Sequence, residues 1–162
     1  MVSSQEGDGD MKSSRRREAG QTPKLAERIG FRGHPMVLAL HPTTIEVTTE
    51  SHLTRKGDCI VGVGSDAGCA GLSEGTKEAL RRDGARVVLR FVVAGESFVV
   101  NAEGDSRLTF THPHDMVIRK SDFISDRTLA VRASAAAKDM PRRMVEALRG
   151  EGTTGYLEIG VV

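Results

Sequence analysis

The sequence predicts an α+β domain with a mainly antiparallel sheet of about seven to nine strands and two helices. Three observations support this class. Short runs of β-branched and apolar residues recur along the chain, turn-forming residues separate several of them, and two stretches show helical spacing. The chain has 162 residues, a length that suits one domain, and we expect residues 26–162 to form it.

Residues 1–25 are expected to be a disordered tail. Aliphatic residues are few there, among Ser, Gly and charged residues, so little apolar surface exists to offset the entropy of ordering. The basic residues Arg15, Arg16 and Arg17 follow an acidic stretch. This triplet is a candidate contact for RNA or a membrane surface, and the alternative, which we favour, is a solvated tail without a partner.

The strands are predicted from their residue pattern. Thr44, Glu46, Thr48 and Glu50 alternate with other residues and share one face, which is typical of a half-buried strand. The turn Ala94-Gly95-Glu96 predicts a hairpin, which a second turn extends into a meander. The other strand candidates are short and apolar or β-branched: residues 36–40, 59–63, 85–93, 97–102, 107–111, 115–120, 128–132 and 156–162.

Two helices are predicted. The first runs over residues 74–83, where Ser73 can cap the N-terminus and Gly84 can close the C-terminus. The second runs over residues 134–149, where Ala, Met and Leu recur at helical spacing. Pro141 lies inside this pattern, and because the apolar stripe stays in phase across it, we expect a kink rather than a break.

The histidines and prolines are coupled. Five of each in 162 residues would give about 0.15 His-Pro pairs by chance, yet the chain has three, at His34-Pro35, His41-Pro42 and His112-Pro113. Proline holds the preceding residue in an extended conformation, so each imidazole is fixed at the entry to a short β-like segment. Either the rings converge on a pocket, or they are structural and bond a nearby backbone carbonyl.

Residues 112–122 are the densest polar segment. In a strand Asp115 and Arg119 share one face, where they can form an ion pair or hold an anion. Arg119, Lys120 and Ser121 at the strand end are candidate anion-binding residues. We predict no metal site and no cofactor, because His34 and His41 would be about 23 Å apart in an extended chain at about 3.3 Å per residue and no CxxC or HExxH spacing occurs.

A glycine-rich segment over residues 62–71 precedes the first predicted helix. This context favours an anion-binding nest, although the spacing matches neither GxGxxG nor a Walker loop. Cys59 is expected to be a buried small side chain. Two cysteines, a net charge of +1 and the lack of a long apolar run suit a reduced, cytoplasmic protein without a membrane span.

Several separated motifs resemble one family. They are Phe31-Arg-Gly-His-Pro35, His41 with residues 43–47, residues 53–63, Asp83-Gly-Ala85, residues 112–122 and residues 127–133. In this order they are similar to the archaeal proteins grouped as domain-of-unknown-function family 371. The resemblance runs from about Phe31 to the C-terminus and implies an archaeal, cytoplasmic, single-domain protein. It implies no activity.

Three functions are left open. The first is an enzyme acting on a small anionic or phosphorylated metabolite. Its candidate catalytic residues are His34, His41, His112 and Asp115, and its candidate anion-binding residues are Arg119, Lys120 and Ser121. The second is an RNA- or nucleotide-binding module using Arg15, Arg16, Arg17, Arg119 and Lys120, against which the 4% aromatic content argues. The third is a protein-interaction scaffold with structural histidines.

Overall fold

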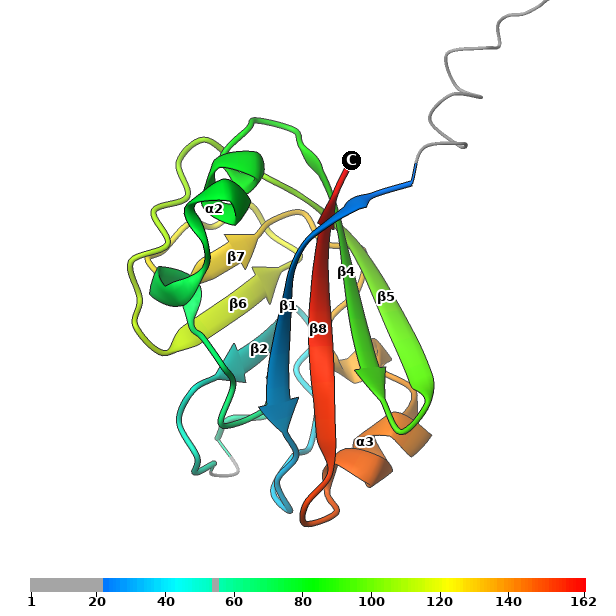
Figure 1. Cartoon of the computed structure of the whole chain (residues 1–162). Helices are drawn as coiled ribbons and strands as arrows, with labels where there is room; N and C mark the ends of the chain where they lie inside the picture. Colours follow the sequence, from blue (N-terminus) through cyan, green and yellow to red (C-terminus); the bar gives the residue numbers. More distant parts are fainter. Residues whose placement is uncertain (1–21, 54–55) are drawn as a thin grey trace, which may run out of the picture.

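The computed structural model describes residues 22–53 and 56–162. Two four-stranded sheets lie against each other, with strand orders β1-β8-β4-β5 and β3-β2-β6-β7 (Figure 1). The elements are β1 (Lys24–Arg32), β2 (Thr44–Thr48), β3 (Ile60–Gly62), α2 (Glu74–Leu80), β4 (Arg86–Val93), β5 (Glu96–Glu103), β6 (Asp115–Arg119), β7 (Thr128–Ala130), α3 (Arg142–Leu148) and β8 (Thr154–Val161). The predicted α+β class is confirmed.

The first sheet is antiparallel throughout, whereas the second is mixed. In the second sheet β2 and β6 form a central antiparallel pair, flanked by β3 and β7 in parallel. Fully buried apolar side chains from both sheets meet in one core, among them Leu89, Phe91, Ile45, Met116 and Ile118. None of the helices in the described residues is long and apolar enough to cross a bilayer.

The start of the fold differs from the sequence expectation. β1 begins at Lys24, so ordered structure starts before residue 26, and the sequence did not reveal this strand. Its N-terminal half is mostly exposed, and the pairing with β8 shifts register between Leu25 and Glu27, which obscures the alternation that marks a strand. Residues 1–21 of the expected tail lie outside the described residues.

Two predicted strands are absent from the described structure. Residues 36–40 and 107–111 pair with no strand, although Val37 and Leu108 are buried. In each segment one residue is left-handed, Ala39 with φ of 51° and Phe110 with φ of 54°. Such a residue cannot continue an extended chain. The apolar residues therefore fill the core from loops, which short apolar runs in a sequence do not distinguish from strands.

The hairpin and the first helix follow the prediction. The β4–β5 turn places Ala94 and Gly95 at positive φ, as a two-residue hairpin turn requires. In α2 the Thr76 amide donates to Ser73 Oγ at 3.3 Å, so Ser73 is the N-cap. The helix ends at Leu80 rather than at residue 83.

The second predicted helix is split, so the expected kink at Pro141 is wrong. A 3₁₀ turn occupies Ala137–Asp139, and α3 begins at Arg142. Pro141 itself has ψ of 133°, an extended value. Proline has no amide hydrogen to donate and is favoured at helix starts. The apolar residues that repeat at helical spacing are buried partly in the 3₁₀ turn and partly in α3.

From β1 to β8 the described part of the chain consists of two repeats, which the sequence analysis did not detect. β1, β2, β3, α2 and β4 are followed by β5, β6, β7, α3 and β8 in the same spatial roles. The left-handed residue Ala39 corresponds to Phe110, and Gly64 to Arg132. The helices end in the same residues, Glu78-Ala79-Leu80-Arg81 and Glu146-Ala147-Leu148-Arg149. An approximate two-fold axis relates the halves.

This axis can be located from the strand register. In the second sheet Glu46 lies opposite Val117, the residue at the same place in the other repeat. In the first sheet Arg90 lies opposite its counterpart Glu158. The axis therefore passes through the centre of both sheets, and Glu46 lies beside it.

Candidate functional site

The three His-Pro histidines use the same ring nitrogen to hold a turn. His34 Nδ1 accepts the Met36 amide at 3.0 Å, and His41 Nδ1 accepts two amides at 3.2 Å. His112 Nδ1 accepts the Asp115 amide at 2.9 Å. Because an amide can only donate, a neutral ring carries its proton on Nε2. The structural partner is thus an amide and not the expected carbonyl.

The second repeat supplies an independent view of the His34 turn. Asp105 stands at the corresponding place, and its Oδ1 accepts the Arg107 amide at 2.9 Å. The His34 amide donates to Leu148 O at 2.8 Å, as the Asp105 amide donates to Leu80 O at 3.0 Å. His34 therefore stabilises its turn as a turn-forming aspartate does, by accepting the amide of the residue two positions later.

A cleft of about 590 Å³ lies over the central β2–β6 pair. It is formed by the polar faces of both strands, the residue before β3 and the loop between β6 and β7. Its lining residues are His41, Thr43, Thr44, Glu46, Cys59, Val117, Arg119, Phe123, Ser125, Asp126 and Arg127. The face that was expected to be solvated is largely covered, since Glu46 is 8% exposed and Thr48 3% exposed.

Two carboxyl groups in and beside the cleft have different surroundings. Burial, followed by the nearby Asp115 charge, raises the pKa of Glu46 to about 7. Asp115 does not line the cleft, and its Oδ2 lies 2.9 Å from Arg127 Nη1 and 3.8 Å from His112 Nε2. One carboxyl is therefore poised to gain or lose a proton near neutral pH, while the other is held by a cation.

The cysteine of the cleft is a thiol and not a thiolate at neutral pH. Burial and the neighbouring Glu46 raise the pKa of Cys59 to about 12, and its Sγ donates to Glu46 Oε1 at 3.4 Å. A thiol in this state is a weak nucleophile. Within residues 22–53 and 56–162, no three His, Cys, Asp or Glu side chains are grouped so as to hold a metal ion.

Arg119 brings a positive charge into the cleft. Its Nε donates to Thr128 Oγ1 at 2.8 Å, and its Nη2 donates to Ser125 Oγ at 3.1 Å. Burial lowers its pKa. Among the described residues no carboxylate lies within ion-pair distance of Arg119. Hydroxyl groups orient the guanidinium, and its positive charge can therefore bind an anion.

The structure brings together some of the predicted site residues and not others. His41 and Arg119 line the cleft, and His112 and Asp115 adjoin it through Arg127. The other three candidates do not line the cleft. His34 lies beside the end of α3, the Lys120 amide donates to Thr43 O, and Ser121 accepts the Arg132 and Phe123 amides. Sequence reasoning missed four residues as site candidates: Glu46, Arg127, Phe123 and Ser125.

A comparison of equivalent residues in the two repeats would have identified those site residues from the sequence. The matching histidines, His41 and His112, build the same turn in both halves. The residues that give the cleft its charge have unlike counterparts, namely Glu46 and Val117, Arg119 and Thr48, Asp115 and Thr44, Arg127 and Cys59, and Phe123 and His52. The two repeats therefore share the backbone fold and the histidine turns, but they differ in the charged and aromatic residues at and beside the cleft.

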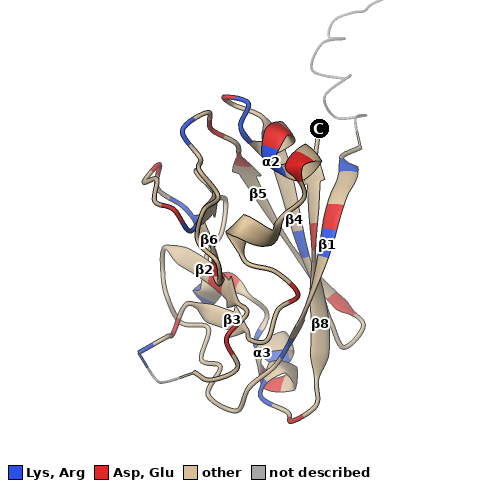
Figure 2. Cartoon of the chain, turned by 60° about the vertical axis from the view of Figure 1, so that its left-hand side comes forward, with Lys and Arg blue, Asp and Glu red and all other residues tan. Residues whose placement is uncertain are grey.

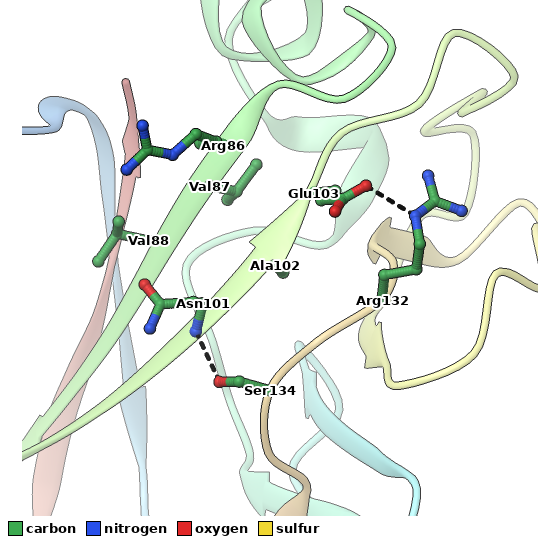
Figure 3. Close-up of a pocket in the computed structure, with 8 residues that line it drawn as sticks. All are labelled: Arg86, Val87, Val88, Asn101, Ala102, Glu103, Arg132 and Ser134. Atoms are coloured by element: carbon green, nitrogen blue, oxygen red, sulfur yellow. Dashed lines mark hydrogen bonds and ion pairs between the residues drawn. The ribbon is translucent and has the colours of Figure 1, made fainter. Parts of the chain in front are cut away.

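A second hollow of about 580 Å³ lies on the first sheet (Figure 3). Its charges and polar groups are mostly paired, since Arg132 Nε donates to Glu103 at 2.7 Å and the Asn101 amide donates to Ser134 Oγ at 3.0 Å. The other repeat has an equivalent hollow lined by Arg32, Gly64 and Asp66 among others. It is therefore a feature of the repeated scaffold.

The glycine-rich segment does not leave an open anion nest. Glu27 Oε1 accepts the Ser73 amide at 3.0 Å and the Thr76 hydroxyl at 2.7 Å, so a carboxylate of the chain itself meets the start of α2. Gly68 packs where any Cβ would strike the backbone of residues 113–114. The glycines thus serve close chain packing.

The RNA hypothesis depends partly on residues that the structure does not describe, because Arg15, Arg16 and Arg17 lie outside them. Over the face drawn in Figure 2, acidic and basic residues are interspersed. Arg119 and Lys120 are consecutive in sequence, but Arg119 points into the cleft and Lys120 does not line it.

Comparisons with known proteins cover the region that holds the cleft. Residues 29–162 match the family described as a domain of unknown function, DUF371. The chain is also 41% identical over 121 residues to an uncharacterised protein of the archaeon Methanocaldococcus jannaschii, an alignment that spans 75% of this chain and 89% of that protein. The family match includes β2, β6 and the loop between β6 and β7.

Proposed function

This chain belongs to the DUF371 family, as its motifs predicted, and we propose that it is an enzyme that performs acid–base catalysis on a small anionic metabolite in the β2–β6 cleft. The observation that carries the proposal is the pair Glu46 and Asp115. A buried carboxyl whose pKa is raised toward neutrality beside a second carboxyl is typical of acid–base sites.

Glu46 is the proposed general acid and base. With a pKa of about 7, both protonation states are populated at neutral pH, which is the condition under which proton transfer is most effective. The Cys59 thiol donates to Glu46 Oε1 and so helps to fix the carboxyl in the wall of the cleft.

Asp115 and Arg127 set the electrostatics around that proton. The neighbouring Asp115 raises the pKa of Glu46, while Arg127 offsets part of this effect. Arg119 is the proposed anchor for the anionic group of the substrate, because its remaining N–H donors have no carboxylate partner in the described part of the chain.

The test is turnover in a mixture of carboxylate- and phosphate-bearing metabolites, followed by mass spectrometry. The wild-type protein and Glu158→Gln, a variant on the first sheet remote from the cleft residues, are expected to deplete the same compound. Glu46→Gln is expected to lose at least about 100-fold in rate. Absence of turnover by the wild-type protein, or equal turnover by Glu46→Gln, would contradict the proposal.

A further inference from the structure

An aromatic ring stands at the cleft beside the proposed anion anchor. Phe123 is 59% exposed and lines the cleft. The Arg119 guanidinium carbon lies over this ring, 5.0 Å from its centroid. A large apolar side chain exposed next to a cation in a cleft offers both charge and a flat apolar surface to a ligand.

Neighbouring side chains hold the Arg119 guanidinium and the backbone of Phe123. The Phe123 amide donates to Ser121 Oγ at 3.3 Å, and Thr128 Oγ1 lies 3.5 Å from the Phe123 carbonyl oxygen. Thr128 is fully buried and also accepts from Arg119 Nε. A preorganised guanidinium beside an anchored backbone loses less entropy when a ligand binds than two free side chains would.

The other repeat shows that the fold does not require this pair. Thr48 ends β2 as Arg119 ends β6, and His52 follows Thr48 by the same four residues by which Phe123 follows Arg119. The His52 side chain is 79% exposed and lies near Glu50. The pair is therefore specific to the half that carries the cleft loop.

The guanidinium has donors to spare for a planar anion. Of its five N–H groups, one on Nε and one on Nη2 are used by described residues. A carboxylate bonded to the remaining donors lies in the guanidinium plane. Groups conjugated to that carboxylate stay in the same plane, and the Phe123 ring, whose centroid is 5.0 Å from the guanidinium carbon, is near enough to contact them.

We infer that the substrate class of this cleft is a planar carboxylate conjugated to an unsaturated or aromatic group. The inference rests on the proposed function, since it takes Arg119 as the anion anchor. It goes further because it proposes that Phe123 makes the cleft bind planar acids more tightly than saturated ones.

The experiment compares benzoate with cyclohexanecarboxylate, which have equal charge and equal carbon number. Their dissociation constants are measured by NMR titration against the full chain. The wild-type protein is expected to prefer benzoate by about threefold to tenfold, the range that aromatic contacts give. Phe123→Ala is expected to remove this preference, and Phe123→Tyr to retain it. Val99→Ala, which removes an exposed apolar side chain from β5, is the control and is expected to keep it.

The outcomes separate this inference from the proposed function. If both acids bind, Arg119→Gln abolishes both, and the wild-type protein shows no preference, the inference about Phe123 is overturned while the anion anchor stands. A preference that survives in Phe123→Ala also overturns it. If neither acid binds, or if Arg119→Gln binds both as the wild-type protein does, the anion anchor fails and the inference fails with it.

Discussion

Glu46 is an ionisable residue whose surroundings disfavour the charged form of its carboxyl group. The carboxyl is 8% exposed and near Asp115, and its pKa is raised from 4.5 to about 7. The native state therefore holds a proton that the unfolded chain releases above pH 4.5. Between these two values the unfolded state binds fewer protons, so the free energy of unfolding decreases as the pH rises.

This residue predicts a stabilising substitution. Glu46→Gln removes the charge, so it is expected to raise the free energy of unfolding by about 3 kcal/mol at pH 8 and by about 1 kcal/mol or less at pH 5. Urea denaturation at both pH values checks this. Glu158→Gln is the control with the opposite sign, because Arg28 and Arg90 hold the pKa of Glu158 below its ordinary value. A Glu46→Gln variant with no gain at pH 8 would show that the charge carries no penalty.

A gain in stability together with a loss of turnover would be informative at this residue. Active sites keep groups that a more stable protein would replace. Glu46 lies opposite Val117 in the β2–β6 pair, and the valine shows which kind of residue the scaffold accepts there without an ionisable group.

Among the elements, the His34 turn is the clearest test of what the His-Pro pairs do. Because Asp105 forms the equivalent turn, His34→Asp is expected to change the free energy of unfolding by less than about 0.5 kcal/mol. His34→Leu, which leaves the Met36 amide without its acceptor, is expected to lose about 1–2 kcal/mol. Urea denaturation distinguishes them, and equal stability of the two variants would refute the structural role of this ring.

The elements also show which parts of the fold a sequence can predict. Alternation in residues 44–48 and the cap at Ser73 are local signals, and both were correct as to element and position. Residues 36–40 and 107–111 have the composition of strands, but one residue with positive φ in each segment prevents an extended strand from forming. Backbone reversal at an alanine or a phenylalanine leaves no compositional mark.

The candidate site was predictable only in part for a related reason. Asp115 and Arg119 were found because they are close in sequence within one strand. Glu46 joins them through cross-strand register, and Arg127 through a loop that folds back onto β6. Such long-range contacts follow from topology, and detection of the internal repeat would have supplied the missing alignment of β2 with β6.

At the scale of the whole molecule, the two halves are interlocked. In the first sheet strands from the two repeats alternate, in the order β1-β8-β4-β5. The loop after each repeat's first strand is hydrogen-bonded to the end of the other repeat's helix, through Leu148 and Leu80. Neither half has a complete sheet without the other.

Two equivalent glycines test this interlocking. A Cβ on Gly33 would overlap the Leu148 carbonyl, and one on Gly104 would overlap the Leu80 carbonyl. Gly33→Ala and Gly104→Ala are each expected to lose about 3 kcal/mol or more in the free energy of unfolding.

Gly75→Ala is the matched control for these two variants. Gly75 lies within α2 with open space around it, so alanine is expected to stabilise the helix by up to about 1 kcal/mol. Thermal denaturation of the three variants gives the comparison. Loss at one glycine and tolerance at the other would mean that the halves contribute unequally.

The position of Glu46 beside the two-fold axis has a consequence for how this site is encoded. Two identical half-length chains assembled about the same axis would place two copies of one residue opposite each other, either two glutamates that repel or two valines that offer no proton. Joining the halves in one polypeptide lets each position be specified separately. The single chain can thus hold one acid, one cation and one ring at a point where a symmetric assembly would be obliged to duplicate them.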